Sequence, residues 1–259
     1  MKPSSIGLVL VLLAGCTSER LTLTPDLPPE RVLQRSVSVQ QAKSTPKPVS
    51  AAKPWPAALV SLSGPDLPTW AVAAPKPSGV MSRTLTPVQL FDKVSPAVYA
   101  VMMAGRFRGS AVAVSSREAI TNCHVVARAG AIVLVNAAAT HNAVVVAADS
   151  TTDRCYLRVQ DGELEPVQGL RDYATLSVGE AVFTIGSPKG MVNTLGNGLL
   201  SGLREMEGVE YAQITAPVSR GSSGGGLFDD RGNLIGVTTF TIQDSQNLNF
   251  AIAASQFWR

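Results

Sequence analysis

Short runs of β-favouring residues, separated by Gly, Asp, Asn or Ser, follow one another after Pro87 and constrain the fold of this chain more than any other feature. They are residues 97–103, 109–114, 131–135, 143–147, 156–159, 181–185, 198–203, 209–214, 234–240 and 248–252. No long helical period interrupts them, and this pattern is typical of an all-β barrel or sandwich. We therefore predict an all-β domain over residues 87–259, made of two six-stranded antiparallel β-barrels joined near residues 161–175.

The N-terminus has the form of an export signal. Lys2 precedes an apolar run at residues 6–14, and Gly15 and Cys16 follow it, as at the cleavage site of a signal peptide. The run is too short to span a bilayer. Residues 13–16, Leu-Ala-Gly-Cys, also resemble a bacterial lipobox, so we expect a signal peptide over residues 1–15 and a lipid, including palmitate, on Cys16. An ordinary secretory signal with an incidental cysteine is the alternative.

Residues 16–86 are rich in Pro, Ser, Ala and Thr and show no sustained strand or helix period. Such a segment buries too little apolar surface to offset the entropy lost on ordering it. We therefore expect a flexible linker that tethers the folded domain to a bacterial membrane through the lipid on Cys16. Thr17 stands where an aspartate would indicate retention at the inner membrane, so the outer membrane is favoured.

The charge and the histidine content argue against two classes of function. The formal net charge is +3 and no run of Lys or Arg with interleaved aromatic residues occurs, so nucleic-acid binding has little support. The chain has only two histidines, far apart, and its carboxylates are scattered, so no cluster of metal ligands is predicted. We expect neither a metal nor a cofactor.

Residues 220–228 contain Ser223, which is framed by glycines and followed by an apolar pair. Glycines let backbone N–H groups crowd around the oxygen that becomes negative when an acyl carbon is attacked. Ser223 is therefore a candidate nucleophile. A plain Gly/Ser turn between two strands explains these residues equally well when they are taken alone.

A nucleophilic serine needs a base, and each of the two histidines is a candidate. His124 follows apolar residues 119–121, and the end of a strand can hold an imidazole at the mouth of a cleft. A half-buried, structural histidine is the alternative at this position. His141 follows residues 137–140 in an apparent hairpin connection, and we expect it to be a solvated loop residue.

A carboxylate must then orient the imidazole. Asp149 and Asp153 both lie between His124 and Ser223 in the chain. Asp153 opens an apolar strand and can point inward, whereas Asp149 belongs to the turn before it. Position alone favours Asp153 only moderately.

Seven motifs occur in an order and spacing that resemble the protease domain of HtrA/Deg-type, trypsin-like serine endopeptidases. They are Ser-Pro-Ala-Val at 95–98, Thr-Asn-Cys-His-Val at 121–125, residues 149–153 with Leu-Arg-Val at 157–159, Val-Gly-Glu at 178–180 with Ile-Gly-Ser-Pro at 185–188, Gly-Leu-Leu-Ser at 198–201, Gly-Ser-Ser-Gly-Gly at 221–225, and Asn-Phe-Ala-Ile at 249–252. The resemblance implies chymotrypsin-like barrels with His124 as general base, Asp153 as orienting carboxylate and Ser223 as nucleophile. It also implies an oxyanion hole formed by the backbone N–H groups of Gly221 and Ser223.

A triad of this kind would bring two cysteines close together. Cys123 lies beside the base, and Cys155 lies two residues beyond the acid. Paired cysteines in an exported protein are oxidised. We therefore predict a disulfide between Cys123 and Cys155.

The resemblance also implies a pocket for the substrate residue that precedes the scissile bond. Residues 217–218, Thr239, Thr241 and Asn249 would form it. Pro217 stands at its expected floor and no Asp or Glu is present there, so nothing would attract Lys or Arg. We expect a preference for small or medium apolar residues.

The chain departs from the family pattern at two positions near the triad. Gly226 stands where Pro or Ala is common, and Arg154 stands where an apolar residue is usual, so the packing behind the triad is expected to differ. No PDZ module follows the protease motifs, and we do not expect PDZ-dependent activation or assembly.

Residues 221–225 also fit the Gly-x-Ser-x-Gly turn of α/β-hydrolases, but that fold places its histidine after the serine. No histidine follows Ser223, and residues 227–240 have the pattern of a β-hairpin, so this alternative is rejected. We interpret the chain as a membrane-tethered, extracytoplasmic serine endopeptidase that acts on proteins or peptides through an acyl-enzyme. A catalytically silent lipoprotein of the same fold, used for binding or envelope assembly, is the alternative.

Overall fold

The computed structural model describes residues 75–128, 130–241 and 247–259. The expected signal peptide, the lipidation site at Cys16 and most of the expected linker therefore lie outside the described residues. Within the described ranges, no helix has the length and apolar character needed to cross a membrane.

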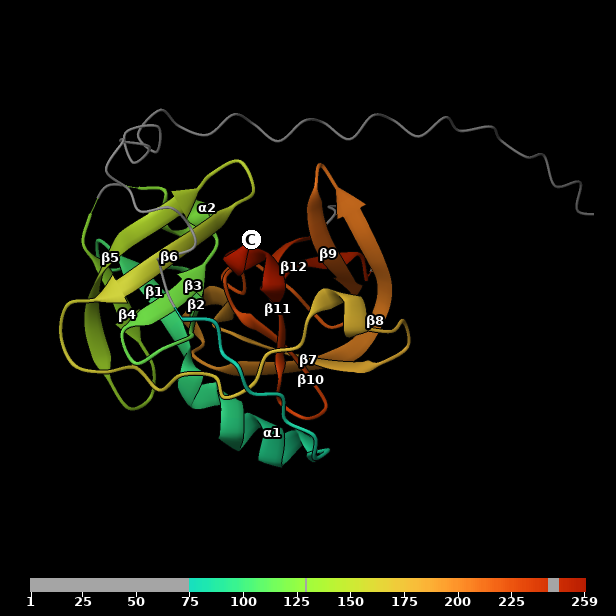
Figure 1. Ribbon diagram of the computed structural model, residues 1–259. Coiled ribbons are helices and arrows are strands. Elements are labelled where there is room, and N and C mark those ends of the chain that lie inside the picture. Colours follow the sequence, from blue (N-terminus) through green and yellow to red (C-terminus); the bar gives the residue numbers. More distant parts are fainter. Residues whose placement is uncertain (1–74, 129, 242–246) are drawn as a thin grey trace, which may run out of the picture. The chain divides into compact units, whose positions relative to one another are not determined.

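Strands of the described residues close into two six-stranded antiparallel barrels, which confirms the predicted fold class (Figure 1). The first barrel, green to yellow in Figure 1, contains β1 (Val98–Met103), β2 (Arg106–Ala113), β3 (Glu118–Thr121), β4 (Ile132–Val135), β5 (Thr140–Asp149) and β6 (Arg154–Val159). The second, orange to red, contains β7 (Ala181–Gly186), β8 (Thr194–Met206), β9 (Val209–Ile214), β10 (Gly226–Asp229), β11 (Leu234–Thr241) and β12 (Asn249–Ala253). The barrels are joined by the segment between β6 and β7, where the sequence predicts the junction.

Helices are few and short among the described residues. They are α1 (Pro87–Val94), α2 (Cys123–Val126) and the 3₁₀ segments η3 (Ser95–Ala97), η4 (Tyr173–Thr175), η5 (Pro188–Gly190) and η6 (Ala254–Trp258). The strand pattern does not predict α1, although its start is marked in the sequence. The side chain of Thr86 accepts a hydrogen bond from the N–H of Gln89 at 3.3 Å, and the side chain of Gln89 accepts one from the N–H of Thr86 at 3.1 Å. This capping box, followed by proline in the first turn, is a recognised helix-start signal.

Three apolar clusters hold the barrels. One fills the first barrel around Tyr99 and Leu134, and another fills the second barrel around Leu200 and Ile214. The third draws on both barrels and includes Tyr156 and Phe228, which are completely buried. Each fully buried large apolar side chain contributes about 1.5–3 kcal/mol to the free energy of unfolding, so the shared cluster fixes one barrel against the other.

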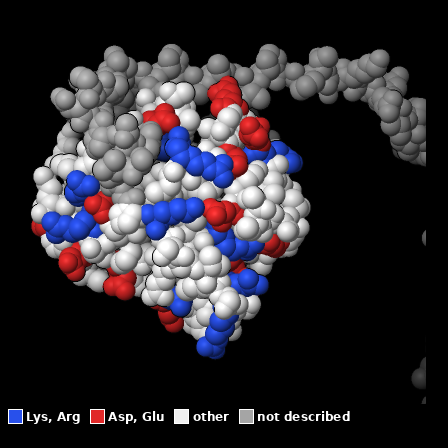
Figure 2. Space-filling model, in the orientation of Figure 1, with Lys and Arg blue, Asp and Glu red and all other residues white. Residues whose placement is uncertain are grey.

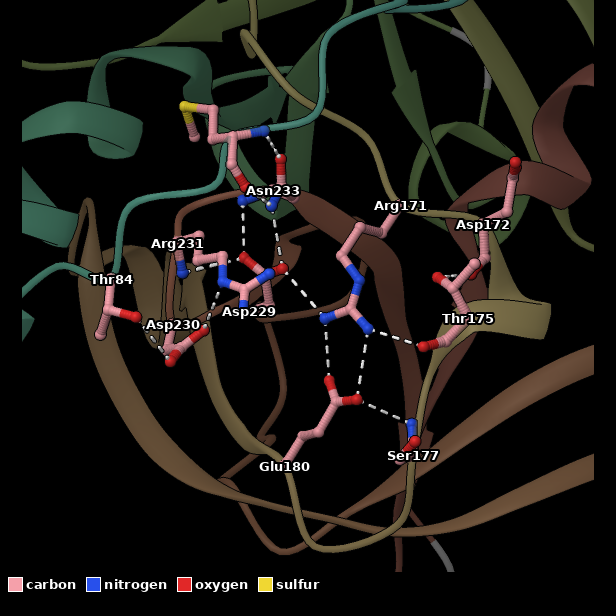
Figure 3. A network of polar contacts seen from close by, with 11 residues as sticks. Thr84, Arg171, Asp172, Thr175, Ser177, Glu180, Asp229, Asp230, Arg231 and Asn233 are labelled. Carbon is pink, nitrogen blue, oxygen red and sulfur yellow. Dashed lines mark hydrogen bonds and ion pairs between the residues drawn. The ribbon is translucent and has the colours of Figure 1, made fainter.

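The segment before α1 packs on the second barrel (Figure 3). The side-chain amide of Asn233 donates from Nδ2 to the carbonyl of Met81 at 2.9 Å, and its Oδ1 accepts from the Met81 N–H at 2.6 Å. The N–H of Leu85 donates to a backbone carbonyl of the β10–β11 turn at 2.9 Å. Packed structure therefore begins earlier than the linker boundary expected at residue 86.

A charged network lies beneath this segment and links it to the connection between the barrels (Figure 3). The guanidinium of Arg171 contacts Glu180 at 2.8 Å and Asp229 at 3.1 Å. Asp229 also accepts from the side-chain amide of Asn233 at 2.9 Å, and its own side chain is only 1% exposed. The hydrogen bond to Glu180 raises the pKa of Arg171; burial opposes this shift, and Asp229 reinforces it.

His141 is buried within β5, so the expectation of a solvated loop residue is wrong. Its Nδ1 lies 3.0 Å from the main-chain oxygen of Asp161, and its ring meets that of Tyr99 edge-on with centroids 6.1 Å apart. The apolar run at residues 143–147 marks only the middle of the strand. Because side chains alternate between the two faces of a strand, His141 turns inward while Thr140 turns outward.

Charges of both signs are interspersed over the face of the molecule drawn in Figure 2. Lys and Arg side chains lie next to Asp and Glu side chains, with uncharged residues between them.

Candidate active site

His124 lies in α2, directly after β3, and is held by one carboxylate. Its backbone N–H donates to Oδ1 of Asp153 at 3.0 Å, and its ring Nδ1 lies 2.8 Å from Oδ2 of the same residue. A carboxylate can only accept, so this contact assigns the proton of a neutral imidazole to Nδ1 and makes Nε2 the acceptor. The two contacts fix both the position and the tautomer of the ring.

The neighbouring aspartate, Asp149, serves a different partner. It accepts from the guanidinium of Arg154 at 2.9 Å and from the hydroxyl of Thr152. Burial alone raises the pKa of Asp149, but the hydrogen bonds from Thr152 and Arg154 outweigh it and keep this pKa below its ordinary value. Arg154 is itself buried and donates to the carbonyl of Gln256, so the arginine that departs from the family pattern joins Asp149 to η6.

Thr239 of β11 supplies a further contact to Asp153. Its hydroxyl donates to Oδ2 at 3.2 Å, and the backbone carbonyl of Asp153 accepts from the side-chain amide of Asn122 at 3.2 Å. The sequence assigns Thr239 only to the substrate pocket, because nothing local shows that β11 crosses behind the aspartate. The contact joins the second barrel to the carboxylate that the first barrel carries.

Ser223 lies in the loop before β10, and the first barrel holds its backbone. The N–H of Ser110 in β2 donates to the carbonyl of Ser223 at 2.8 Å, and the N–H of Gly224 donates to Thr238 at 2.8 Å. Gly224 has φ +84°, and a Cβ there would collide with the carbonyl of Ser110, so only glycine fits. The loop is therefore fixed by contacts with both barrels.

Ser223 and His124 line the same cavity, which has a volume of about 440 Å³. The hydroxyl of Ser223 donates to the main-chain oxygen of Thr239 at 2.8 Å. A nucleophilic serine gives this proton to an imidazole, so in catalysis the hydroxyl would have to donate to His124 instead. Such bonds in active sites often tighten only when substrate is present.

The backbone around Gly221 leaves two donors available. The N–H groups of Gly221 and Ser223 donate to no acceptor within the described residues. The carbonyl of Arg220 accepts from the N–H of Lys189 at 3.1 Å. Because the peptide bond is trans, the N–H of Gly221 points the opposite way, away from Lys189. The two N–H groups are thus free to bind an anionic oxygen.

Comparisons with known proteins agree with this arrangement. A trypsin-like peptidase domain model matches residues 109–237. The mitochondrial serine protease HTRA2 of Bos taurus is 30% identical over 213 residues, which cover 74% of this chain and 46% of the relative. The putative serine protease HhoA of Synechocystis is 29% identical over 249 residues, which cover 89% and 59% of the two chains. The chain thus spans about half the length of the curated relatives it matches.

Among solved structures, one match covers most of the relative's chain. Deg5 is 32% identical with a TM-score of 0.57, and the match covers 65% of this chain and 88% of Deg5. The chain belongs to the HtrA/Deg family of trypsin-like serine proteases. An HtrA-type protease, AlgW, solved with a tripeptide, is 28% identical with a TM-score of 0.61 and coverage of 66% and 61%. Membership of the HtrA/Deg family confirms the resemblance and explains the paired barrels.

In this HtrA/Deg chain, the residues expected to form one substrate pocket do not all line the same cavity. Thr239 and Thr241 line the cavity with Ser223, whereas Pro217 lines a neighbouring cavity of about 340 Å³. The side chain of Asn249 is directed elsewhere, since its Nδ2 donates to the carbonyl of Ala216 at 2.9 Å. Asn249 therefore supports the chain leading into the pocket.

Cys123 and Cys155 form the predicted disulfide, with Cα atoms 4.9 Å apart. It joins the residue before His124 to β6, beyond Asp153. The two cysteines are 32 positions apart in the chain. The disulfide therefore ties together the two segments that carry His124 and Asp153.

Replacing Cys123 and Cys155 together by alanine should lower the free energy of unfolding by about 3–4 kcal/mol, because the closed loop restricts the unfolded chain. Urea denaturation of the oxidised protein and of the double variant measures this difference. Adding reductant should destabilise the natural protein and leave the double variant unaffected. Equal stability of the two proteins under oxidising conditions would contradict the prediction.

Proposed function

We propose that this chain is an extracytoplasmic serine endopeptidase that uses His124, Asp153 and Ser223. One observation carries the proposal: Ser223 and His124 line one cavity while Asp153 holds the imidazole Nδ1 at 2.8 Å. A serine beside an oriented imidazole is the arrangement that acyl transfer requires. The serine proteases of the same family, HTRA2 and HhoA among them, support this class of reaction.

In the proposed mechanism, substrate binding moves the hydroxyl of Ser223 from the carbonyl of Thr239 to Nε2 of His124. The imidazole takes the proton as the serine oxygen attacks the peptide carbonyl, and it returns the proton to the amine that leaves. Water then attacks the acyl-enzyme by the same route and restores Ser223. The carboxylate of Asp153 stays ionised throughout and stabilises the imidazolium.

Two backbone donors would stabilise the oxyanion that forms during each attack. The N–H groups of Gly221 and Ser223 donate to no protein acceptor within the described residues, and both residues line the cavity. Donors fixed in advance are effective because they need no reorganisation as charge develops, and each contributes about 2.7–4 kcal/mol to lowering the barrier.

The proposal includes a location for the protease and a class of substrate. Several relatives are named probable periplasmic serine endoproteases, and the lipobox-like residues 13–16 would anchor this chain to an envelope membrane through Cys16. The Pro-rich linker would hold the protease domain away from that membrane. Substrates would be proteins or peptides with a small or medium apolar residue before the scissile bond, because the residues expected to form the pocket include no acid.

Digestion of an unfolded protein tests the proposal. Full-length protein incubated with β-casein should generate fragments whose new N-termini lie at internal positions, as read by mass spectrometry. The Ser223→Ala variant should generate none. Casein that stays intact beside folded, natural-sequence protein would contradict the proposed activity.

A catalytically silent binding module is the second candidate function. It is favoured by the hydrogen bond of the Ser223 hydroxyl to the main-chain oxygen of Thr239, which engages the proton that a nucleophile would give to its base. In that case the natural protein and Ser223→Ala should retain casein equally without cleaving it.

A further inference from the structure

The cavity beside Ser223 carries positive charge that the triad does not use. Ten described residues line it, and two of these are arginines, Arg108 and Arg220, while none is Asp or Glu. Within the described residues, neither guanidinium has a hydrogen-bonded or ion-paired carboxylate. An anionic ligand in this cavity would therefore meet two cations without having to displace an acid of the described residues.

Arg108 is placed at the cavity by an irregularity in its strand. In the pairing of β1 with β2, Val101 faces Gly109 and Met102 faces Phe107, so Arg108 is the extra residue of a β-bulge. A bulge turns the side chain of its extra residue out of the regular alternation of the strand. The bulge directs this arginine to the cavity, whereas Arg106, two residues earlier, keeps regular pairing and does not line it.

Arg108 is half-buried, and the local structure leaves one of its donor atoms unsatisfied. Its Nε is inaccessible to solvent and has no hydrogen-bond partner among the described residues. Leaving a buried donor unsatisfied costs free energy that a structural arginine ordinarily recovers through an ion pair. The arginine thus lines the cavity at the cost of one unsatisfied donor.

The side of the cavity on which Arg108 lies identifies the part of the substrate that it reaches. Arg108 comes from β2 of the first barrel, which also carries His124, whereas Thr239 and Thr241 belong to β11 of the second barrel and line the same cavity. In the proposed mechanism His124 gives its proton to the leaving amine, so the leaving peptide lies along the first barrel. The residues that follow the scissile bond would therefore pass Arg108.

We propose that Arg108 binds a carboxylate in the leaving-group part of the substrate, within the first two residues after the scissile bond. The inference rests on the proposed endopeptidase function and adds a preference that the apolar pocket before the bond does not supply. A guanidinium recognises a carboxylate through charge-assisted hydrogen bonds. The carboxylate can belong to a Glu or Asp side chain or to a C-terminus at the same place.

The test uses short fluorescent peptides with Val before the intended scissile bond. The first set has an amidated C-terminus and carries Glu or Gln at the first or second position after the bond. The second set ends at the first or second position after the bond, with either a free or an amidated carboxyl group. Cleavage by the natural protein gives kcat/KM. Binding to Ser223→Ala, followed by fluorescence anisotropy, gives Kd without catalysis.

A peptide with a carboxylate should exceed its neutral partner by about 10-fold in both kcat/KM and affinity, as expected for a charge-assisted hydrogen bond. The advantage should shrink with added salt. Arg108→Gln should reduce the ratio to about one-to-one, while Arg106→Gln, which removes the same charge from the same strand, should keep it. A preference in the amidated set identifies a side-chain carboxylate, and a preference confined to free carboxyl termini identifies the C-terminus.

The outcomes separate the two proposals. Cleavage of charged and neutral peptides at equal rates would overturn the role of Arg108 and leave the endopeptidase function intact. A charge preference in binding that Arg108→Gln abolishes, without cleavage of any peptide, would support the carboxylate site and reject the endopeptidase. A preference that survives Arg108→Gln would also overturn the inference.

Discussion

Replacing His124 by alanine is expected to lower kcat for peptide hydrolysis by about 10⁴ to 10⁶-fold, because serine, histidine and aspartate act as one unit and loss of one member disables the others. The variant should stay folded, since the His124 side chain is 36% exposed and occupies no apolar core. Initial rates on a fluorogenic peptide measure the effect, with circular dichroism as the control for folding. A folded variant that retains more than a tenth of the activity would contradict the role of His124.

The two neighbouring aspartates provide a matched pair for the same test. Asp153→Asn should lower kcat by about 10⁴-fold, because an amide at Asp153 favours the wrong tautomer of His124. Asp149→Asn makes the same chemical change four positions away, but it touches Arg154 instead, so it should lower stability and leave kcat within a few-fold of the natural value. Equal losses of kcat in both variants would contradict the assignment of the acid.

The largest effect on stability is expected at Asp229. Asp229→Ala should lower the free energy of unfolding by about 3–5 kcal/mol, because it leaves the guanidinium of Arg171 without one of its two acids and removes an acceptor from Asn233. Guanidinium chloride denaturation measures the change. Trypsin should also cut sooner after Lys76 or Arg83 in this variant. Asp229 accepts a hydrogen bond from the side chain of Asn233, and Asn233 in turn holds the segment before α1.

Asp230 is the control for this prediction. It is the next residue, but its side chain is 41% exposed, so Asp230→Ala should change the free energy of unfolding by less than about 0.5 kcal/mol. Two variants of equal stability, or an Asp229→Ala protein as stable as the natural one, would show that the network in Figure 3 does not hold the domain.

The barrels could be predicted from local pattern because each strand is short, rich in β-favouring residues and bounded by turn residues. Such a pattern gives the middle of a strand better than its ends. For that reason β5 extends to Thr140, and His141 is buried where a loop was expected. The helix α1 was not predicted for a different reason. Its capping box is visible in the sequence, but eight residues are too few to show a periodic apolar face.

Contacts between distant residues outside the family motifs could not be predicted. Asp149 and Asp153 look alike in the sequence, and only the position of Arg154 in space shows which of them is already engaged. The attachment of Met81 to Asn233 likewise spans 152 positions. Arg108 escapes notice in the sequence because a β-bulge becomes visible only when two strands are paired.

Covalent labelling of Ser223 tests the proposed chemistry most directly. A fluorophosphonate probe reacts with a serine only when a neighbouring base activates it. The folded, full-length protein should therefore become labelled, with the adduct on Ser223 in the mass spectrum of its peptides, and labelling should disappear in Ser223→Ala and fall sharply in His124→Ala. A folded protein that stays unlabelled, or a label that persists in Ser223→Ala, would contradict a nucleophilic role for this serine.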